Sequence, residues 1–178
     1  QFLRIECFQD NKVVAAASAT CGGKRASDLD CHHNRRSTIT PPKDKAIPFH
    51  PSMPSFSRYF EYWPTLGSLP FSNAPELKTG GWIRSRGDAR LDQPMICALL
   101  DAWWPALYLA IETPRPMGTV SCCIDFTHPP LPLPHPDPFL LVNNCLEVRE
   151  GYSIEHNLLW SSNGTLLAQS QQSLVVIR

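Results

Sequence analysis

Asp101 is a single carboxylate inside an otherwise apolar run, residues 96–110, and Pro105 follows it four residues later. Because proline has no amide hydrogen, the carbonyl of Asp101 loses its usual helical partner, so the helix should kink or end nearby. A carboxylate beside an apolar helix face must be solvated or paired, since burying it alone is costly. Asp101 is therefore either an exposed residue on the helix edge or one member of a reactive group of side chains.

Gln172 is a second polar residue in apolar surroundings. Counted by two, as side chains alternate along a strand, it shares a face with Leu166, Ala168, Ser170, Leu174 and Val176. A buried carboxamide needs partners for its oxygen and for both hydrogens. Two interpretations are open: Gln172 satisfies a backbone group or reaches solvent, or it holds a water molecule or polarises a carbonyl group.

The element that carries Asp101 has the signals of a helix. Asp92 is a plausible N-cap, and Pro94 falls in the first turn, where a missing amide costs little. Spacings of three and four predict one apolar stripe and one flanking stripe that contains the acid. The apolar stripe is Ile96, Leu99, Leu100, Trp103 and Leu107, and the flanking stripe is Cys97, Asp101, Trp104 and Tyr108.

Strand patterns surround this helix. A short strand, WIRSRGD, precedes it, and four strands follow it, with a turn at Gly151 and a two-residue hairpin signal at Asn163-Gly164. In the first of the four, residues 119–126, strict alternation places Thr119 and Asp125 on one face and Cys122 on the other. Asp125 is then either a surface charge or a residue that orients its neighbours.

The first 80 residues differ in character. Residues 2–8 and 12–21 read as two strands joined by a turn, whereas residues 23–79 are rich in proline and favour an extended linker. The chain begins without methionine, inside a strand pattern, so we expect the front of a preceding unit to be missing. We therefore expect three parts: a remnant hairpin at 1–22, a linker at 23–79 and a complete domain at 80–178.

Composition bounds the function classes. Sixteen basic and sixteen acidic residues cancel, so no overall charge points to nucleic acid or to an anionic membrane. The apolar runs are shorter than the roughly 18 residues that a membrane-spanning helix needs. We expect a soluble intracellular protein, cytoplasmic by default, and a peroxisomal location also fits.

The seven cysteines form no disulfide framework, which favours reduced thiols. Cys21 with Cys31, His32 and His33 fits no common zinc pattern, so we predict no metal site. Cys122 and Cys123 point to opposite strand faces and indicate packing rather than a nucleophile.

Taken in order, five motifs make residues 80–178 resemble the C-terminal half of the acyl-CoA thioesterase II type, the double hot-dog thioesterases. The motifs are WIRSRG, LLDAWWPA, GTVSCCIDFTHPP, LLWSSNGTLLAQSQQ and SLVVIR. The hairpin at 2–21 resembles the end of that family's first hot-dog unit. The resemblance implies an α+β hot-dog fold, a long helix wrapped by a curved antiparallel sheet.

The resemblance also implies a catalytic site at Asp101, Thr119 and Gln172. In that family an aspartate, a threonine or serine and a glutamine orient the water that attacks the thioester carbonyl, with no cofactor and no metal. A one-residue shift in register would exchange Gln171 for Gln172, and the LLAQSQQ motif favours Gln172. The expected partner is an acyl-CoA substrate, cleaved to free acid and CoA.

Two other functions stay open. A hot-dog domain can bind an acyl chain or a protein partner without turnover, and hydratase chemistry on this fold is a weaker alternative because no Asp and His pair has the required spacing. Open strand edges also predict a homo-oligomer that pairs through the sheet edges.

Overall fold

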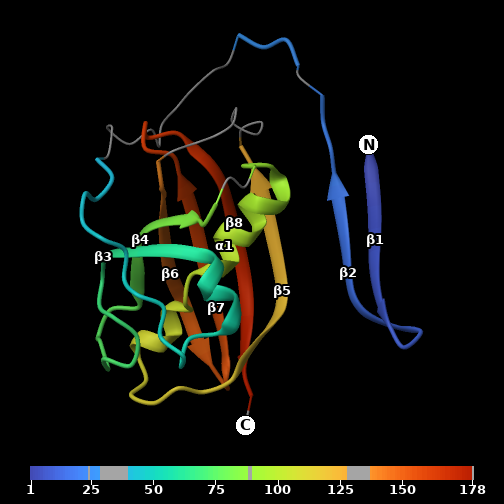
Figure 1. Ribbon diagram of the computed structural model, residues 1–178. Helices are drawn as coiled ribbons and strands as arrows, with labels where there is room; N and C mark the ends of the chain where they lie inside the picture. Colours follow the sequence, from blue (N-terminus) through green and yellow to red (C-terminus); the bar gives the residue numbers. More distant parts are fainter. Residues whose placement is uncertain (24, 29–39, 88–89, 128–136, 178) are drawn as a thin grey trace. The chain divides into compact units, whose positions relative to one another are not determined.

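The structure is a computed structural model that describes residues 1–23, 25–28, 40–87, 90–127 and 137–177 (Figure 1). It divides into two compact units, Gln1–His33 and Asn34–Arg178. In the part of the chain that the structure describes, no helix is long and apolar enough to cross a membrane.

The first unit contains the hairpin that the sequence predicts. Strands β1 (Phe2–Gln9) and β2 (Lys12–Thr20) pair antiparallel. Asp10 and Asn11 join them with φ angles of 49° and 59°, the left-handed conformation that two-residue hairpin turns require.

The second unit is a six-stranded antiparallel sheet with a helix against one face (Figure 1). The strand order is β3-β4-β6-β7-β8-β5, so β3 and β5 are its edges. The elements are η1 (Ser55–Tyr59), β3 (Phe60–Leu66), β4 (Lys78–Ser85), α1 (Gln93–Ala102), η2 (Ala106–Leu109), β5 (Met117–Phe126), β6 (Phe139–Arg149), β7 (Tyr152–Trp160) and β8 (Leu166–Val176). The predicted order of strand, helix and four strands, three of them in a meander, is confirmed.

The assignment of all residues 23–79 to a linker is wrong for β3. This strand pairs with β4, and Pro64 lies opposite Gly81 at the sheet edge, where a missing amide is tolerated. The pairing is close because Gly81 has no side chain: a Cβ there would lie 2.1 Å from the carbonyl oxygen of Trp63. Proline density excluded a central strand but not an edge strand.

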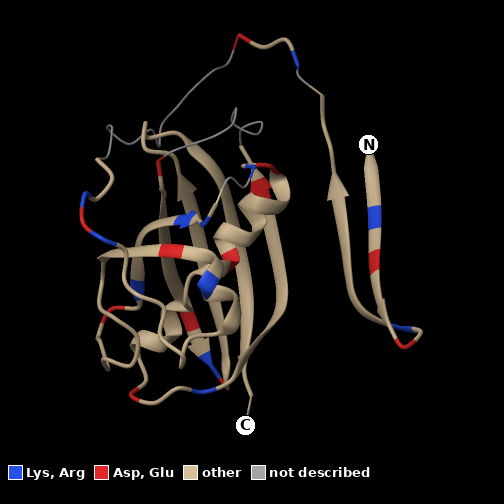
Figure 2. Ribbon diagram, in the orientation of Figure 1, with Lys and Arg blue, Asp and Glu red and all other residues tan. Residues whose placement is uncertain are grey.

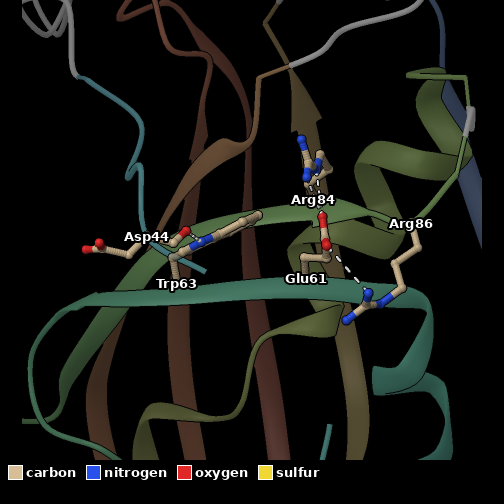
Figure 3. A network of polar contacts seen from close by, with 5 residues as sticks. All are labelled: Asp44, Glu61, Trp63, Arg84 and Arg86. Atoms are coloured by element: carbon tan, nitrogen blue, oxygen red, sulfur yellow. Dashed lines mark hydrogen bonds and ion pairs between the residues drawn. The ribbon is translucent and has the colours of Figure 1, made fainter. Parts of the chain in front are cut away.

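Polar contacts on the outer face hold β3 and β4 together (Figure 3). The Nε atom of Arg84 donates to Glu61 Oε2 at 2.8 Å, and Arg86 Nη1 lies 3.4 Å from Glu61 Oε1. The Trp63 indole donates to the carbonyl of Asp44 at 2.8 Å. Because these side chains are partly exposed, each ion pair stabilises the edge only modestly.

Helix α1 begins and ends where the sequence predicts. Asp92 Oδ1 accepts a hydrogen bond from the amide of Met95 at 3.0 Å, and the helix stops at Ala102, before Pro105. The Tyr62 hydroxyl donates to the Ala102 carbonyl at 3.1 Å and so partners one of the helix-end carbonyls.

Two apolar clusters lie on opposite faces of the sheet. The cluster beneath α1 includes Ile83, Leu99, Leu141, Leu159 and Leu167. The other includes Trp82, Leu140, Val142 and Trp160. The face beneath α1 is called the inner face below.

Charged residues of both signs are scattered along the ribbon of the described residues (Figure 2). Two carboxylates of the second unit are of more interest individually: Asp101 accepts a hydrogen bond from Gln172 of β8, and Glu155 accepts from the backbone amide of Ala106 in η2.

Candidate active site

The structure brings Asp101, Thr119 and Gln172 together from α1, β5 and β8. Gln172 Nε2 donates to Asp101 Oδ1 at 2.8 Å and to Thr119 Oγ1 at 2.7 Å. An ionised carboxylate only accepts hydrogen bonds, so the nitrogen of the carboxamide must be the atom that faces Asp101. Both N–H groups of Gln172 are thus used within the site, and its oxygen is left to accept from a further group.

Strand β8 points Gln172, rather than Gln171, at this site. Gln172 is buried, with 7% of its surface exposed, whereas Gln171 is exposed. Across the sheet Gln172 lies opposite Glu155 of β7 and Cys122 of β5. The register expected from the sequence is therefore the one present.

A bulge in β5 places Thr119 beside Gln172. Thr119 lies opposite Leu174 and Ser121 lies opposite Ser173, so Val120 has no cross-strand partner. A bulge of one residue changes which face the following side chains occupy. Thr119 and Cys122 consequently share the inner face, and the strict alternation expected for this strand is wrong.

The bulge also separates Asp125 from the site. Asp125 pairs with Gln169 in the register and accepts a hydrogen bond from the Gln169 side chain at 3.1 Å. Gln169 also contacts His156, which lies on the face opposite the buried Glu155 and Asn157. Asp125 is therefore an outer-face residue and does not orient Thr119.

Asp101 lies in the last turn of α1. The carbonyl end of a helix carries partial negative charge, so an acidic residue there is unfavourable for helix stability. Its side chain meets Gln172 instead of a basic residue. A charge placed against the helix dipole is expected at sites kept for function rather than for stability.

Beside these residues lies a cavity of about 410 Å³, within the usual size range of small-molecule sites. Asp101, Thr119 and Gln172 all line it. Its aromatic lining comprises Phe56, Tyr62, Phe71, Trp103, Trp104 and Tyr108. Its polar lining from β6 and β7 includes Asn143, Glu155 and Asn157.

The Glu155 carboxylate is almost wholly buried, at 1% exposure. Its oxygens accept from the amides of Ala106 and Leu107 at 2.9 and 3.0 Å and from Asn143 Nδ2 at 2.7 Å. Burial raises the pKa of Glu155, and these three hydrogen bonds oppose the rise. Glu155 therefore anchors η2 to the sheet and shapes the cavity wall.

Sequence reasoning missed this polar wall. In β7 the polar side chains Ser153, Glu155 and Asn157 are buried, and the intervening positions, such as Ile154 and Leu158, are half-buried. An alternating strand normally turns its polar side chains to solvent. No pattern along the chain could have found it, because the position of Glu155 opposite Gln172 depends on the register between β7 and β8.

The Cys122 thiol lies on the inner face near Asp101, yet it is poorly suited to attack a substrate. Partial burial and then the charge of Asp101 raise the pKa of Cys122. A thiol held in its protonated form is a weak nucleophile. The arrangement favours a water molecule as the attacking group.

Among the residues that the structure describes, no three His, Cys, Asp or Glu side chains are placed to hold a metal ion. Of the metal-ligating residue types weighed in the sequence, Cys31, His32 and His33 lie outside the described residues, and Cys21 is exposed.

Comparison with known proteins gives a family and a fold. A family model described as the acyl-CoA thioesterase C-terminal domain matches residues 36–176. No curated protein matches the chain.

Three solved structures are similar. A conserved protein with a hot-dog fold from Alicyclobacillus acidocaldarius shares 24% identity over 100% of this chain and 67% of its own, with a TM-score of 0.85. A candidate thioesterase II from Thermobifida fusca YX shares 17% over 99% and 67%, with a TM-score of 0.72. An acyl-CoA thioesterase II from Mycobacterium marinum shares 16% over 99% and 68%, with a TM-score of 0.61. The predicted α+β hot-dog fold is confirmed.

Proposed function

Since the chain belongs to the acyl-CoA thioesterase C-terminal domain family, we propose that it hydrolyses acyl-CoA thioesters to free acid and CoA with an activated water. The observation that supports this is the contact of Gln172 Nε2 with both Asp101 and Thr119 on the wall of a cavity. The three residues supply a base, a hydroxyl and a carboxamide around one point, which is the set of groups needed to hold a water for attack.

Asp101 is the proton acceptor in this proposal. One carboxylate oxygen holds Gln172, and the other accepts a hydrogen bond from water. As the water oxygen bonds to the thioester carbonyl carbon, its proton passes to Asp101. The tetrahedral intermediate then expels the CoA sulfur, which takes up the proton, and the free acid remains.

Thr119 and Gln172 are the positioning groups. The Thr119 oxygen accepts from Gln172, so its hydroxyl hydrogen is directed elsewhere and can donate to the water or to the substrate carbonyl. The Gln172 oxygen accepts the second hydrogen of the water. Holding the attacking atom at a fixed angle contributes strongly to rate, and a shift of about 1 Å can cost about 100-fold.

The test is hydrolysis of acyl-CoAs of short, medium and long chain by the full chain and by Asp101→Asn. We expect turnover in the wild type and a loss of roughly 10²- to 10⁴-fold in the variant, the range of general base catalysis. Asp125→Asn is the matched control, because Asp125 is a carboxylate on the outer face of β5, the strand that carries Thr119. Equal losses in both variants, or full activity in Asp101→Asn, would refute the assignment.

A folded wild type without turnover would instead support the binding module. The binding of acyl-CoA is then measured by calorimetry. This measurement separates a domain that binds the acyl chain from one that does not bind acyl-CoA. Unfolding curves for each variant show whether a lost rate reflects a lost fold.

We also propose that a hairpin at 1–22, a connecting segment and a hot-dog unit make up the chain, and that a second copy of the chain pairs at the sheet edges. The edge strands β3 and β5 of the described sheet support the pairing, because unpaired strand edges present open hydrogen-bonding groups. Sedimentation of the full chain at several concentrations tests for a dimer or larger assembly.

A further inference from the structure

The carboxylate of the site stands at the least supported part of α1. Asp101 is the last residue but one of a ten-residue helix, and Trp103, directly after the helix, is already extended. The last carbonyls of a helix have no partner within the helix, so its end frays unless other groups hold it. The last turn also contains no basic residue that would offset the negative charge of Asp101 at the carbonyl end. The position of Asp101 therefore depends on contacts from outside the helix.

One such contact comes from β3. The Tyr62 hydroxyl donates to the carbonyl of Ala102, the residue after Asp101, at 3.1 Å. The contact is buried, and Tyr62 is 3% exposed. In such surroundings a hydrogen bond is electrostatically stronger than in water. The contact joins the last turn of α1 to a strand that lies 40 residues earlier in the chain.

Tyr62 is itself held in place, so its hydroxyl has a fixed direction. Its backbone lies opposite Ile83 of β4, and its carbonyl accepts from the amide of Ile47 at 2.9 Å. Its ring packs against Trp103 and Trp104, with ring centroids 5.7 and 6.3 Å away. A supporting side chain sets the geometry of a reactive group only when its own conformation is locked. Tyr62 meets that condition.

The hydroxyl of Tyr62 remains a donor across the pH range of an activity assay. Burial raises the pKa of Tyr62 to about 12, and a hydrogen bond with the Ser57 side chain opposes the rise. The Ala102 carbonyl can only accept, so the contact needs the phenol proton. Because the phenol keeps this proton, the contact does not vary with pH during the assay.

The tolerance of the site to movement of the helix end is small. Gln172 Nε2 donates to Asp101 Oδ1 at 2.8 Å and to Thr119 Oγ1 at 2.7 Å. A displacement of about 0.5 Å at the end of α1 would lengthen the first bond beyond the usual limit of about 3.2 Å. The second bond joins two strands of the sheet and would stay. A frayed helix end would thus remove Asp101 and leave Thr119 and Gln172 in place.

We propose that Tyr62 is a positioning residue: by holding the Ala102 carbonyl, it keeps the Asp101 carboxylate where it accepts the proton of the attacking water. This inference rests on the proposed thioester hydrolysis. Tyr62 takes no part in the proton transfer itself, since its hydroxyl hydrogen is engaged with Ala102.

The experiment compares Tyr62→Phe with wild type on the acyl-CoA that the wild type hydrolyses fastest. Phenylalanine keeps the ring and removes the donor. We expect kcat to fall about tenfold, short of the roughly 100-fold cost of a shift of about 1 Å. KM should change by less than about twofold, because the substrate contacts stay. An unchanged kcat overturns the proposal.

Tyr59→Phe is the matched control, since Tyr59 is 65% exposed and does not line the cavity. It should leave kcat and KM at the wild-type values, and a loss equal to that of Tyr62→Phe would count against the proposal. Thermal unfolding shows that each variant is folded at the assay temperature. One lost hydrogen bond in Tyr62→Phe should lower Tm by about 2–4 °C.

A double variant separates positioning from a general structural effect. In Asp101→Asn the base is absent, so adding Tyr62→Phe should lower the residual kcat by less than about twofold. A residue that only supports the fold or the cavity would lower kcat by the same factor in both backgrounds. Equal factors in the two backgrounds therefore overturn the proposal.

Failure of the proposed function has a different signature. If the folded wild type hydrolyses no acyl-CoA, NMR measures the exchange of the Gln172 side-chain amide hydrogens with water, with their signals assigned by their absence in Gln172→Ala. Exchange should be several-fold faster in Tyr62→Phe than in wild type or Tyr59→Phe, because one N–H loses Asp101. That result supports the placement of Asp101 by Tyr62 without the hydrolysis. Equal exchange in all three proteins overturns it.

Discussion

Beneath α1 the inner face of the sheet is apolar, with Leu141 and Leu159 fully buried. Beyond the helix end the same face carries Asn143, Glu155 and Gln172, which are also buried but polar. The apolar half gains stability from water-free packing. In the polar half each buried side chain needs hydrogen-bond partners, as Glu155 has in Ala106, Leu107 and Asn143.

The boundary between the halves is the end of α1 at Ala102. Pro105 prevents the helix from continuing, and the 3₁₀ turn η2 takes its place, held by Glu155. Had the helix continued, its side chains would have covered the polar face. One proline therefore separates the part of the sheet that the helix covers from the part that lines the cavity.

The largest effect on stability should come from the apolar half. Leu159→Ala removes a fully buried side chain, so we expect the free energy of unfolding to fall by about 2–5 kcal/mol. Urea unfolding measures it. Leu158→Ala is the control, because Leu158 is half-buried on the other face. A loss of stability in Leu158→Ala as large as that in Leu159→Ala would contradict the assignment of the main apolar core to the inner face of the sheet.

In the polar half the larger effect should be on rate. Gln172→Ala removes the group that joins Asp101 to Thr119, and we expect kcat/KM to fall about 100-fold. The free energy of unfolding should change by less than about 1 kcal/mol, since the lost bonds are few and lie near the surface. Gln171→Ala, on the neighbouring exposed residue, should alter neither quantity.

A smaller effect is expected at the start of the helix. Asp92→Ala removes the N-cap contact with the Met95 amide and should lower the free energy of unfolding by about 1 kcal/mol. Thermal unfolding detects this, with Gln93→Ala as the exposed control next to it. Activity of the folded Asp92→Ala variant should persist, because the opposite end of α1 carries Asp101.

The smallest effect should be a dependence of stability on pH. Because burial raises the pKa of Glu155 above its ordinary value of 4.5, the folded protein keeps this proton to a higher pH than the unfolded chain does. The free energy of unfolding should therefore fall as pH rises from 4.5 through the raised pKa, and then level off. The free energy of unfolding of wild type and of Glu155→Gln is measured across this pH range. Within the range it should fall more steeply with pH in the wild type, and above the raised pKa the two proteins should show the same pH dependence. A wild type whose stability rises there relative to the variant contradicts the sign.

Local signals in the sequence were enough to predict the helix and most of the strands. Asp92 and Pro94 predicted the start of α1, and Pro105 predicted its end, because capping and the missing proline amide act within one or two turns. The face of Gln172 also followed from alternation along β8. The strand at Phe60–Leu66 was missed because proline excludes a residue from the inside of a sheet more strongly than from its edge.

The site needed information that no local pattern contains. The bulge at Val120, which turns Thr119 toward Gln172, depends on the register between β5 and β8. The burial of Glu155 depends on the amides of Ala106 and Leu107, which come from a segment about 50 residues earlier. An alternating strand has the same pattern whichever face is covered, so the pattern does not reveal that the polar residues of β7 are buried.

By itself the sequence determined the helix with its cap and its stop, most strands and turns, and the residue types that could move a proton. These depend on contacts within a few residues of one another, so they can be read along the chain. Only the tertiary structure decided which of those residues meet and which polar side chains are buried. Meeting across 53 or 71 residues, as Gln172 meets Thr119 and Asp101, requires the register and packing of the whole sheet.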